Sequence, residues 1–316
     1  MQKFNQLFLA FLTIAIFITC TSTAKQRPEG GWLWKISGNG LSHPSYLFGT
    51  YHGTYQYTDS IPELHQAFNA CSQFAGESET TSKPTPAQVG VAIKLPKDTT
   101  YADLLNKEDF HFLDSIVRQS LKSPLNKVYI KPNFLALILG EIEKGKKLVD
   151  TGYSQSQIDS MKSQVMDIAL EKKAKEKGLT IVGLEGIFDA FVSEKSNLKK
   201  EADELISDLR EDDEISPLSF VNTLSDVYRT QNMKSLIDFE VKVDSIFRTS
   251  PKLTEIGKRI REDLLKRRNL NWMNKIPELM KAQPTFIAVG VRHLPGKDGL
   301  IALLLEKGYQ VEPIGL

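Results

Sequence analysis

The stretch TFIAVGVRHLPGKDGLIALLLEKGYQVEPI, residues 285–314, decides the fold. It begins after Pro284 with an apolar run, continues through a leucine-rich segment at 299–307, and ends in YQVEPI after Gly308. This order predicts a strand, a helix, a glycine cap and a closing strand. The same helix–glycine–strand unit recurs in KGLTIVGLE, residues 177–185. Because helices that feed apolar strands imply a partly parallel sheet, we expect an α+β (α/β-like) fold with a mixed central sheet flanked by helices.

Both ends of the chain are rich in strand patterns and enclose a helical middle. Three further segments have the pattern of strands: WLWKIS (32–37), SYLFGTYH (45–52) and SQFAGES (72–78). Turn-forming residues separate the first two, which predicts a hairpin. Helical spacing dominates residues 101–178 and 201–280, with residues 253–280 in the pattern of one long helix. We expect a single domain over residues 25–316 with a long α-helical insertion at about 80–282.

Composition limits the kind of protein this can be. Hydrophobic residues make up 41% of the 316 residues, which is ordinary for a globular chain. Lys and Arg total 40 against 39 Asp and Glu, so the basic excess of a nucleic-acid binder is missing, and we expect no nucleic-acid partner. The only cysteines are Cys20 and Cys71, which excludes a disulfide scaffold and a cysteine-built zinc site. We expect Cys71 to be a small core residue.

Residues 1–24 have the order of a secretory signal. Lys3 precedes an apolar run at 7–18, which would reach only about 18 Å as a helix, short of a bilayer core of about 30 Å. Two outcomes stay open: cleavage after Ala24, or lipidation of Cys20, whose preceding residues make a poor lipobox. In either case we expect an extracytoplasmic protein, periplasmic or secreted or anchored as a lipoprotein, with membrane contact only through the lipid.

Two strands end in the same motif, Gly-x-x-His. Gly49 and His52 close the strand near the N-terminus, and Gly290 and His293 close the strand near the C-terminus. The carboxyl ends of parallel strands line the ligand crevice of open sheets, and glycine allows a close approach there. The residues leave two interpretations open, a paired functional site or two histidines that each bond to a loop. The other histidines lack this context, so we expect surface or packing roles for His43, His65 and His111.

Acidic residues also follow strand patterns. Glu77 and Glu79 follow one strand, and Glu185 follows another. A carboxylate in such a place is costly unless it pairs, binds a metal or reaches solvent. Together with two histidines these groups predict a His/carboxylate cluster, whose mixed donors suit Zn, Mn, Co or Fe. Arg268 and Asn269 lie just upstream of the second His strand, and the low helix propensity of Asn269 hints at a polar task.

The motifs FGTYH, AGESE, GLEG, RRNLNW and AVGVRHLPGKDGLIALLLEKGYQVEPI resemble those of the TraB/GumN family, which includes the TIKI metalloproteases. Their order and spacing extend over nearly the whole mature chain. The resemblance implies a divalent-metal-dependent hydrolase or peptidase that acts outside the cytoplasm. The family's motif residues fall on His52, His293, Glu77, Glu79, Glu185, Arg268 and Asn269. The family's Thr is replaced by Gly186, and the Gln that normally follows is absent, with Ala190 and Phe191 nearby.

These observations favour an enzyme. We expect His52, His293 and Glu77 to hold one metal ion that activates water for attack on an amide. Glu185 would be the general base, although the sequence does not order the two glutamates, and Arg268 or Asn269 would stabilise the oxyanion. The expected partner is a peptide or small-molecule substrate. The alternatives are an envelope protein that binds a peptide or a haem-like ligand without chemistry, and a purely structural envelope protein. Motifs of serine hydrolases, zincins, P-loop proteins and dinucleotide-binding proteins are absent.

Overall fold

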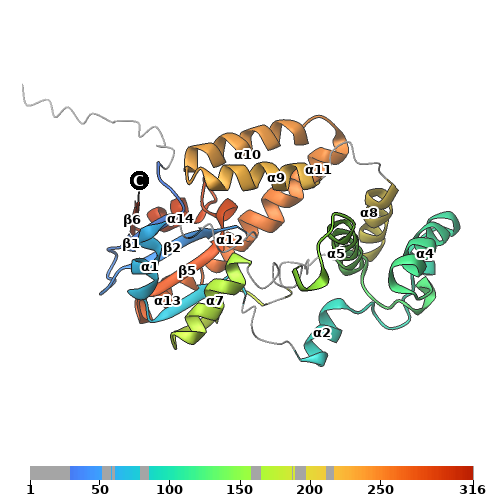
Figure 1. Ribbon diagram of the computed structural model, residues 1–316, viewed down its shortest axis with the longest axis horizontal. Coiled ribbons are helices and arrows are strands. Elements are labelled where there is room, and N and C mark those ends of the chain that lie inside the picture. The colour runs from blue at the N-terminus through green and yellow to red at the C-terminus, as the bar shows by residue number, and fades with distance from the viewer. Residues whose placement is uncertain are drawn as a thin grey trace, which may run out of the picture.

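The computed structural model describes residues 29–51, 58, 61–78, 85–157, 165–186, 188, 197–210 and 217–315. Within them lies a six-stranded sheet with the strand order β4-β3-β5-β2-β1-β6 (Figure 1). The strands are β1 (Leu33–Ser37), β2 (Ser45–Thr50), β3 (Gln73–Gly76), β4 (Thr180–Gly183), β5 (Thr285–Gly290) and β6 (Gln310–Pro313). With helices around this sheet, the expected α+β class is confirmed.

The sheet is mixed because its two halves run differently. β4, β3, β5 and β2 are parallel neighbours, whereas β1 pairs antiparallel with both β2 and β6. The predicted hairpin of the first two strands is therefore confirmed. Thr50 lies opposite Gly290, and Gly76 lies opposite both Gly183 and Ala288. The carboxyl ends of four neighbouring strands thus reach the same edge, and that edge positions the candidate site.

Three helices each directly precede a strand of the sheet in the sequence: α1 (Pro62–Asn69), α13 (Ile276–Ala282) and α14 (Leu300–Glu306). A 3-10 turn, η4 (Val291–His293), directly follows β5. α7 (Met166–Glu176) packs against β3 and β4. The recurring helix–glycine–strand unit is also confirmed, because α7 leads through Gly178 into β4 and α14 leads through Gly308 into β6. Both glycines have positive φ, +77° and +89°, the conformation that ends a helix in this way.

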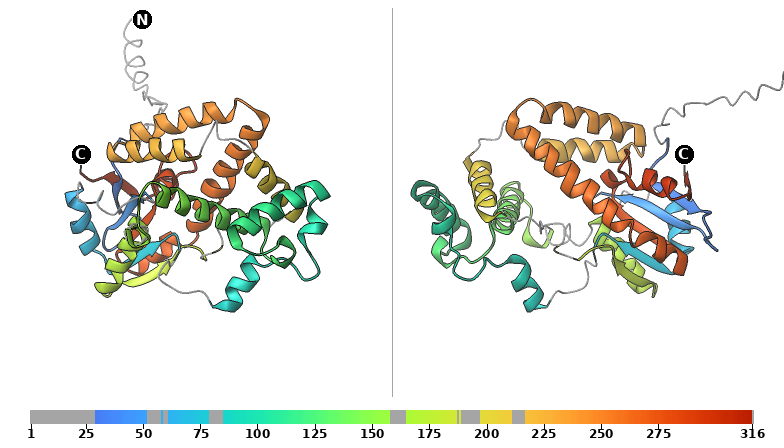
Figure 2. Two further views of the ribbon diagram at one scale, coloured as in Figure 1. Left: turned by 45° about the vertical axis from the view of Figure 1, so that its right-hand side comes forward. Right: turned by 180° about the vertical axis from the view of Figure 1, so that it is seen from behind.

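The remaining helices lie between β3 and β5 in the sequence. They are α2 (Pro86–Ile93), α3 (Tyr101–Leu104), α4 (Lys107–Leu121), η2 (Leu125–Lys127), α5 (Pro132–Asp150), α8 (Leu198–Arg210), α9 (Pro217–Arg229), α10 (Met233–Phe247), α11 (Pro251–Arg259), the π-helix η3 (Ile260–Lys266) and α12 (Arg267–Trp272). In Figures 1 and 2, α4, α5 and α8 gather on one side of the molecule, away from the sheet, while α9, α10 and α11 form a separate group.

Two hydrophobic cores correspond to this division. The larger core surrounds the sheet and includes Phe68, Phe74 and Phe286, whose rings are in mutual contact. The smaller core belongs to α3, α4, α5 and α8, and its fully buried members include Leu113 and Leu135. The helical group therefore buries apolar surface of its own, separate from that of the sheet.

The helical pattern expected over residues 253–280 is confirmed, although the segment is not one unbroken α-helix. The segment divides into α11, η3, α12 and α13, and a turn at 273–275 separates the last two. The helical spacing that starts at residue 101 corresponds first to two helices, α3 and α4, and the side chain of Asn106 caps the start of α4. Within the described residues, none of the helices is long and apolar enough to cross a membrane. The expected signal at 1–24 lies outside the described residues.

Candidate active site at the carboxyl edge of the sheet

Three of the predicted residues come to the site from neighbouring strands. Glu77 directly follows β3, and Glu185 follows β4 by two residues. The Glu185 N–H donates to the carbonyl oxygen of Glu77 at 2.8 Å, which continues the β3–β4 pairing past the strand ends. His293 is the last residue of η4 and is only 4% exposed. The parallel register therefore brings together residues more than a hundred positions apart in the sequence.

Arg268 joins these groups from α12. Its Nη2 donates to Glu77 Oε2 and to Glu185 Oε1, both at 2.5 Å, and its Nε donates to Glu185 Oε1 at 2.9 Å. Its Nη1 lies 3.3 Å from Nε2 of His293. One guanidinium thus holds two carboxylates and an imidazole in a single hydrogen-bonded cluster, in which each charge has an opposite partner.

Electrostatics keep the ion pairs charged. Burial by itself would raise the pKa of Glu77, but electrostatic interactions with His293 and Arg268, together with the Gly290 N–H bond, outweigh burial and lower that pKa to about 2. Burial would also lower the pKa of Arg268, whereas its bonds and charge interactions with Glu185 and Glu77 raise it. Around neutral pH the cluster therefore contains an ionised carboxylate at Glu77 and a charged guanidinium.

Asn269 orients the imidazole of His293. Its Nδ2 donates to the carbonyl oxygens of His293 at 3.2 Å and of Asp298 at 2.8 Å, so its Oδ1 is the atom that faces His293 Nδ1 at 2.7 Å. An amide oxygen only accepts, which places a proton on Nδ1. Arg268 Nη1 only donates, so it faces the lone pair of Nε2 in the neutral imidazole. Nε2 is also 3.9 Å from Glu77 Oε1 and is therefore the ring atom turned toward the carboxylate.

Trp272 is a site residue that the sequence analysis missed. Its Nε1 donates to Glu185 Oε2 at 3.0 Å. Its ring centroid lies 4.5 Å from that of His293, and the guanidinium carbon of Arg268 lies 4.7 Å from it. The available signal was its spacing: Trp272 is four residues after Arg268 on a helix and must share a face with it.

The two motif glycines allow close approaches. A Cβ on Gly49 would lie 2.9 Å from Cγ2 of Val291 and 3.0 Å from Cδ2 of Leu294, so β2 could not pack as closely against η4. A Cβ on Gly290 would lie 3.2 Å from Glu77 Oε1, the oxygen that accepts the Gly290 N–H at 2.7 Å. Glycine therefore keeps the edge compact enough for Glu77 to bond to the end of β5.

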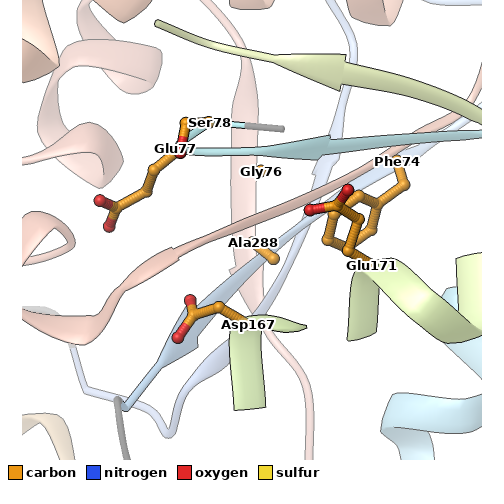
Figure 3. Close-up of a pocket in the computed structure, with 7 residues that line it drawn as sticks. All are labelled: Phe74, Gly76, Glu77, Ser78, Asp167, Glu171 and Ala288. Atoms are coloured by element: carbon orange, nitrogen blue, oxygen red, sulfur yellow. The ribbon is translucent and has the colours of Figure 1, made fainter. Parts of the chain in front are cut away.

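A cavity of about 100 Å³ adjoins Glu77 (Figure 3). Two carboxylates of α7, Asp167 and Glu171, line it together with Phe74 and Ala288 from the sheet. Asp167 also accepts a 2.6 Å hydrogen bond from the hydroxyl of Thr50 at the end of β2. The cavity has room for only a few water-sized groups. The sequence analysis did not single out these carboxylates, because they face the edge from a helix rather than from a strand end.

The structure brings together Glu77, Glu185, Arg268, Asn269, Gly290 and His293, while Gly49 packs beside them. His52 and Glu79 lie outside the described residues, as do Ala190 and Phe191. Among the residues that the structure does describe, no group of three His, Cys, Asp or Glu could hold a metal ion. The remaining histidines, His43, His65 and His111, are exposed, and Cys71 is buried with its pKa raised to about 12 mainly by burial.

Comparison with known proteins agrees with the motifs at these strand ends. No curated protein and no solved structure matches the chain. The sequence pattern of the TraB/PrgY/gumN family matches residues 32–313, from just before β1 to the end of β6. The chain belongs to the TraB/PrgY/gumN family.

Proposed function

We propose that the protein is a divalent-metal-dependent hydrolase, and specifically a peptidase, that acts outside the cytoplasm. The observation that carries the proposal is the convergence of His293 and Glu77 beside Glu185 and Arg268 at one edge of the sheet. A purely structural protein gives no reason to assemble an imidazole, two carboxylates and a guanidinium at the carboxyl ends of parallel strands, where ligand sites of such sheets lie.

The donor set fits a divalent metal. His293 Nε2 and Glu77 Oε1, which lie 3.9 Å apart, would hold the metal through one nitrogen and one oxygen donor, and the bound ion would supply a Lewis acid there. The bond from Nδ1 to Asn269 is the support that metal-binding histidines usually have. We propose His52 as a further ligand, because it follows β2 by two residues and β2 pairs with β5 at this edge. Manganese, cobalt and zinc suit these nitrogen and oxygen donors.

The residues around the ligands have distinct tasks in this proposal. When bound, the metal would act as a Lewis acid on water and on the scissile carbonyl. Glu185 would take a proton from the attacking water and return it to the leaving amine. Arg268 would donate to the developing oxyanion. Asn269 suits a positioning role better than an oxyanion role, because its N–H groups already donate to two backbone carbonyls.

The proposed location comes from the sequence of residues 1–24. Cleavage after Ala24 gives a soluble extracytoplasmic protein, and acylation of Cys20 gives a lipoprotein. Cell fractionation with intact-mass analysis distinguishes the two, and a full-length chain in the cytosol would contradict both.

A peptide-library screen tests the function. The mature protein is incubated with fluorogenic peptides in Mn²⁺, Co²⁺ or Zn²⁺, and in parallel with EDTA. Cleavage that requires a metal and falls about 10²–10⁴-fold in Glu185→Gln supports the proposal, since this is the usual contribution of acid–base assistance. If the protein cleaves nothing but binds peptide or haem, the alternative of a binding protein replaces the hydrolase.

A further inference from the structure

Trp272 contacts three functional side chains at once. It is fully buried, and the i, i+1 and i+4 spacing of Arg268, Asn269 and Trp272 on α12 turns all three residues toward the strand ends. Its indole N–H bonds to Glu185, and its ring packs against His293 and Arg268. None of the sequence motifs assigns it a task.

The two oxygens of Glu185 are held from different sides. Oε1 accepts the two shortest bonds from Arg268, at 2.5 and 2.9 Å, while Oε2 accepts the indole N–H of Trp272 at 3.0 Å and a longer bond from Arg268 Nε at 3.2 Å. Without the indole bond, Oε2 would keep only the longer bond from Arg268 and would be held less firmly than Oε1. An indole N–H can only donate a hydrogen bond, so Glu185 Oε2 must be the acceptor in this contact.

We propose that Trp272 is a positioning residue: its indole N–H fixes the carboxylate plane of Glu185, and its ring face fixes the imidazole plane of His293. The kinetic part of this inference rests on the proposed function, because it treats Glu185 as the base. The structural part does not, and it is tested without any substrate.

Trp34 provides a matched control. Its indole N–H also donates a 3.0 Å bond, to the carbonyl of Gly31, and the residue is only 3% exposed. Trp34→Phe therefore removes a buried indole bond of the same length as Trp272→Phe does, but without contact to Glu185.

The structural test uses the indole N–H resonances of the mature protein. The chain has three tryptophans, so ¹⁵N-indole labelling gives three signals, which Trp→Phe variants assign. The Trp272 signal should move in Glu185→Gln and stay in place in Glu278→Gln, which changes an exposed carboxylate of α13. The Trp34 signal should stay in place in both. A Trp272 signal that does not move in Glu185→Gln overturns the inference, whatever the activity of the protein.

The kinetic test is a double-mutant cycle on a peptide that the screen identifies. Trp272→Phe should lower kcat about 10- to 100-fold and change KM less than about twofold, as expected for loss of a hydrogen bond to a charged group that acts in the chemical step. Trp34→Phe should leave kcat unchanged. In the Glu185→Gln background, adding Trp272→Phe should lower kcat by less than a further factor of about two. An equal loss in both backgrounds overturns the inference and leaves the hydrolase intact. If the wild type cleaves no peptide, the proposed function fails and the NMR result alone decides the role of Trp272.

Discussion

Asn269 uses both ends of its amide to hold one histidine. Asn269→Ala removes the partner of His293 Nδ1 and the donor to two backbone carbonyls. We expect a loss of about 1–3 kcal/mol in the free energy of unfolding, the usual cost of leaving buried polar groups unpaired, and a 10- to 100-fold weaker Mn²⁺ affinity. Urea unfolding and Mn²⁺ titration measure the two effects.

Asn271 is the control for that change, because it lies on the same helix but is exposed. Asn271→Ala should leave both quantities close to those of the wild type. An Asn269→Ala protein that loses stability but binds Mn²⁺ with full affinity would show that the amide supports the fold and not the ligand.

Glu77 makes stability depend on pH in the acid range. Its pKa is lowered from 4.5 to about 2 in the folded protein, so its contribution is fully present above about pH 4.5 and is lost as the pH falls toward 2. The shift corresponds to about 3 kcal/mol. In metal-free protein, Glu77→Gln should flatten the fall in unfolding free energy between pH 5 and 2, as measured by denaturant titration at each pH.

The matched variant is Glu306→Gln, which changes an exposed carboxylate at the end of α14. The prediction fails if the unfolding free energy of Glu77→Gln and of Glu306→Gln falls equally steeply between pH 5 and pH 2.

The strand-end residues of the candidate site could be picked out from the sequence for a physical reason. Glu77, Glu185 and His293 each follow an apolar strand, and parallel strands end together, so local patterns imply a shared edge. Trp272 and Asp167 lack such a signal, because they reach the site from helices. For Trp272 the only local signal was its spacing of four residues from Arg268, and for Asp167 the face of α7 that meets the edge depends on how that helix packs.

At the scale of elements, β2 and η4 must lie very close together. Gly49 packs closely against η4, and Tyr228 also holds it, because the Tyr228 hydroxyl donates to the Gly49 carbonyl oxygen at 2.8 Å. Gly49→Ala should cost about 1–3 kcal/mol of unfolding free energy, because the added Cβ overpacks the contact with Val291 and Leu294.

Gly140, inside α5, has no heavy atom within 4 Å of an added Cβ. Gly140→Ala should therefore stabilise the protein by about 0.5–1 kcal/mol through its higher helix propensity. Denaturant midpoints compare the two variants. Equal midpoints would mean that the β2–η4 contact is looser than the structure describes.

Element boundaries were less predictable than element types. Residues 253–280 have continuous helical periodicity, yet η3 widens the helix into a π-helix directly before α12. A π-turn adds a residue to the hydrogen-bonded ring, so it changes the face that the following residues present, and such turns are frequent at functional sites. α2 was not expected, although Thr85 and Gln88 form a capping box around its start, with Pro86 at the first position.

At the scale of the whole molecule, the presence of two hydrophobic cores predicts that the helices around one core can unfold without the sheet around the other. Leu113 is fully buried in the core of α3, α4, α5 and α8. Leu113→Ala should cost about 2–5 kcal/mol in that core. Hydrogen exchange should then speed up in α4 and α5 and change little in β5, because partly independent units open separately.

Leu137 on α5 is 43% exposed, so Leu137→Ala is the control and should change exchange little anywhere. Faster exchange across the sheet in Leu113→Ala would show instead that the two cores unfold as one unit.

The proposed function requires that His293 and Glu77 bind a divalent metal at the carboxyl edge of the sheet. Isothermal titration of the metal-free mature protein with Mn²⁺, Co²⁺ and Zn²⁺ tests it most directly, with His293→Ala as the test variant and His111→Ala, which changes an exposed histidine, as the control. We expect one bound ion per chain in the wild type and in His111→Ala, and none in His293→Ala. Absence of binding in the wild type, or binding of equal affinity in His293→Ala, would contradict it.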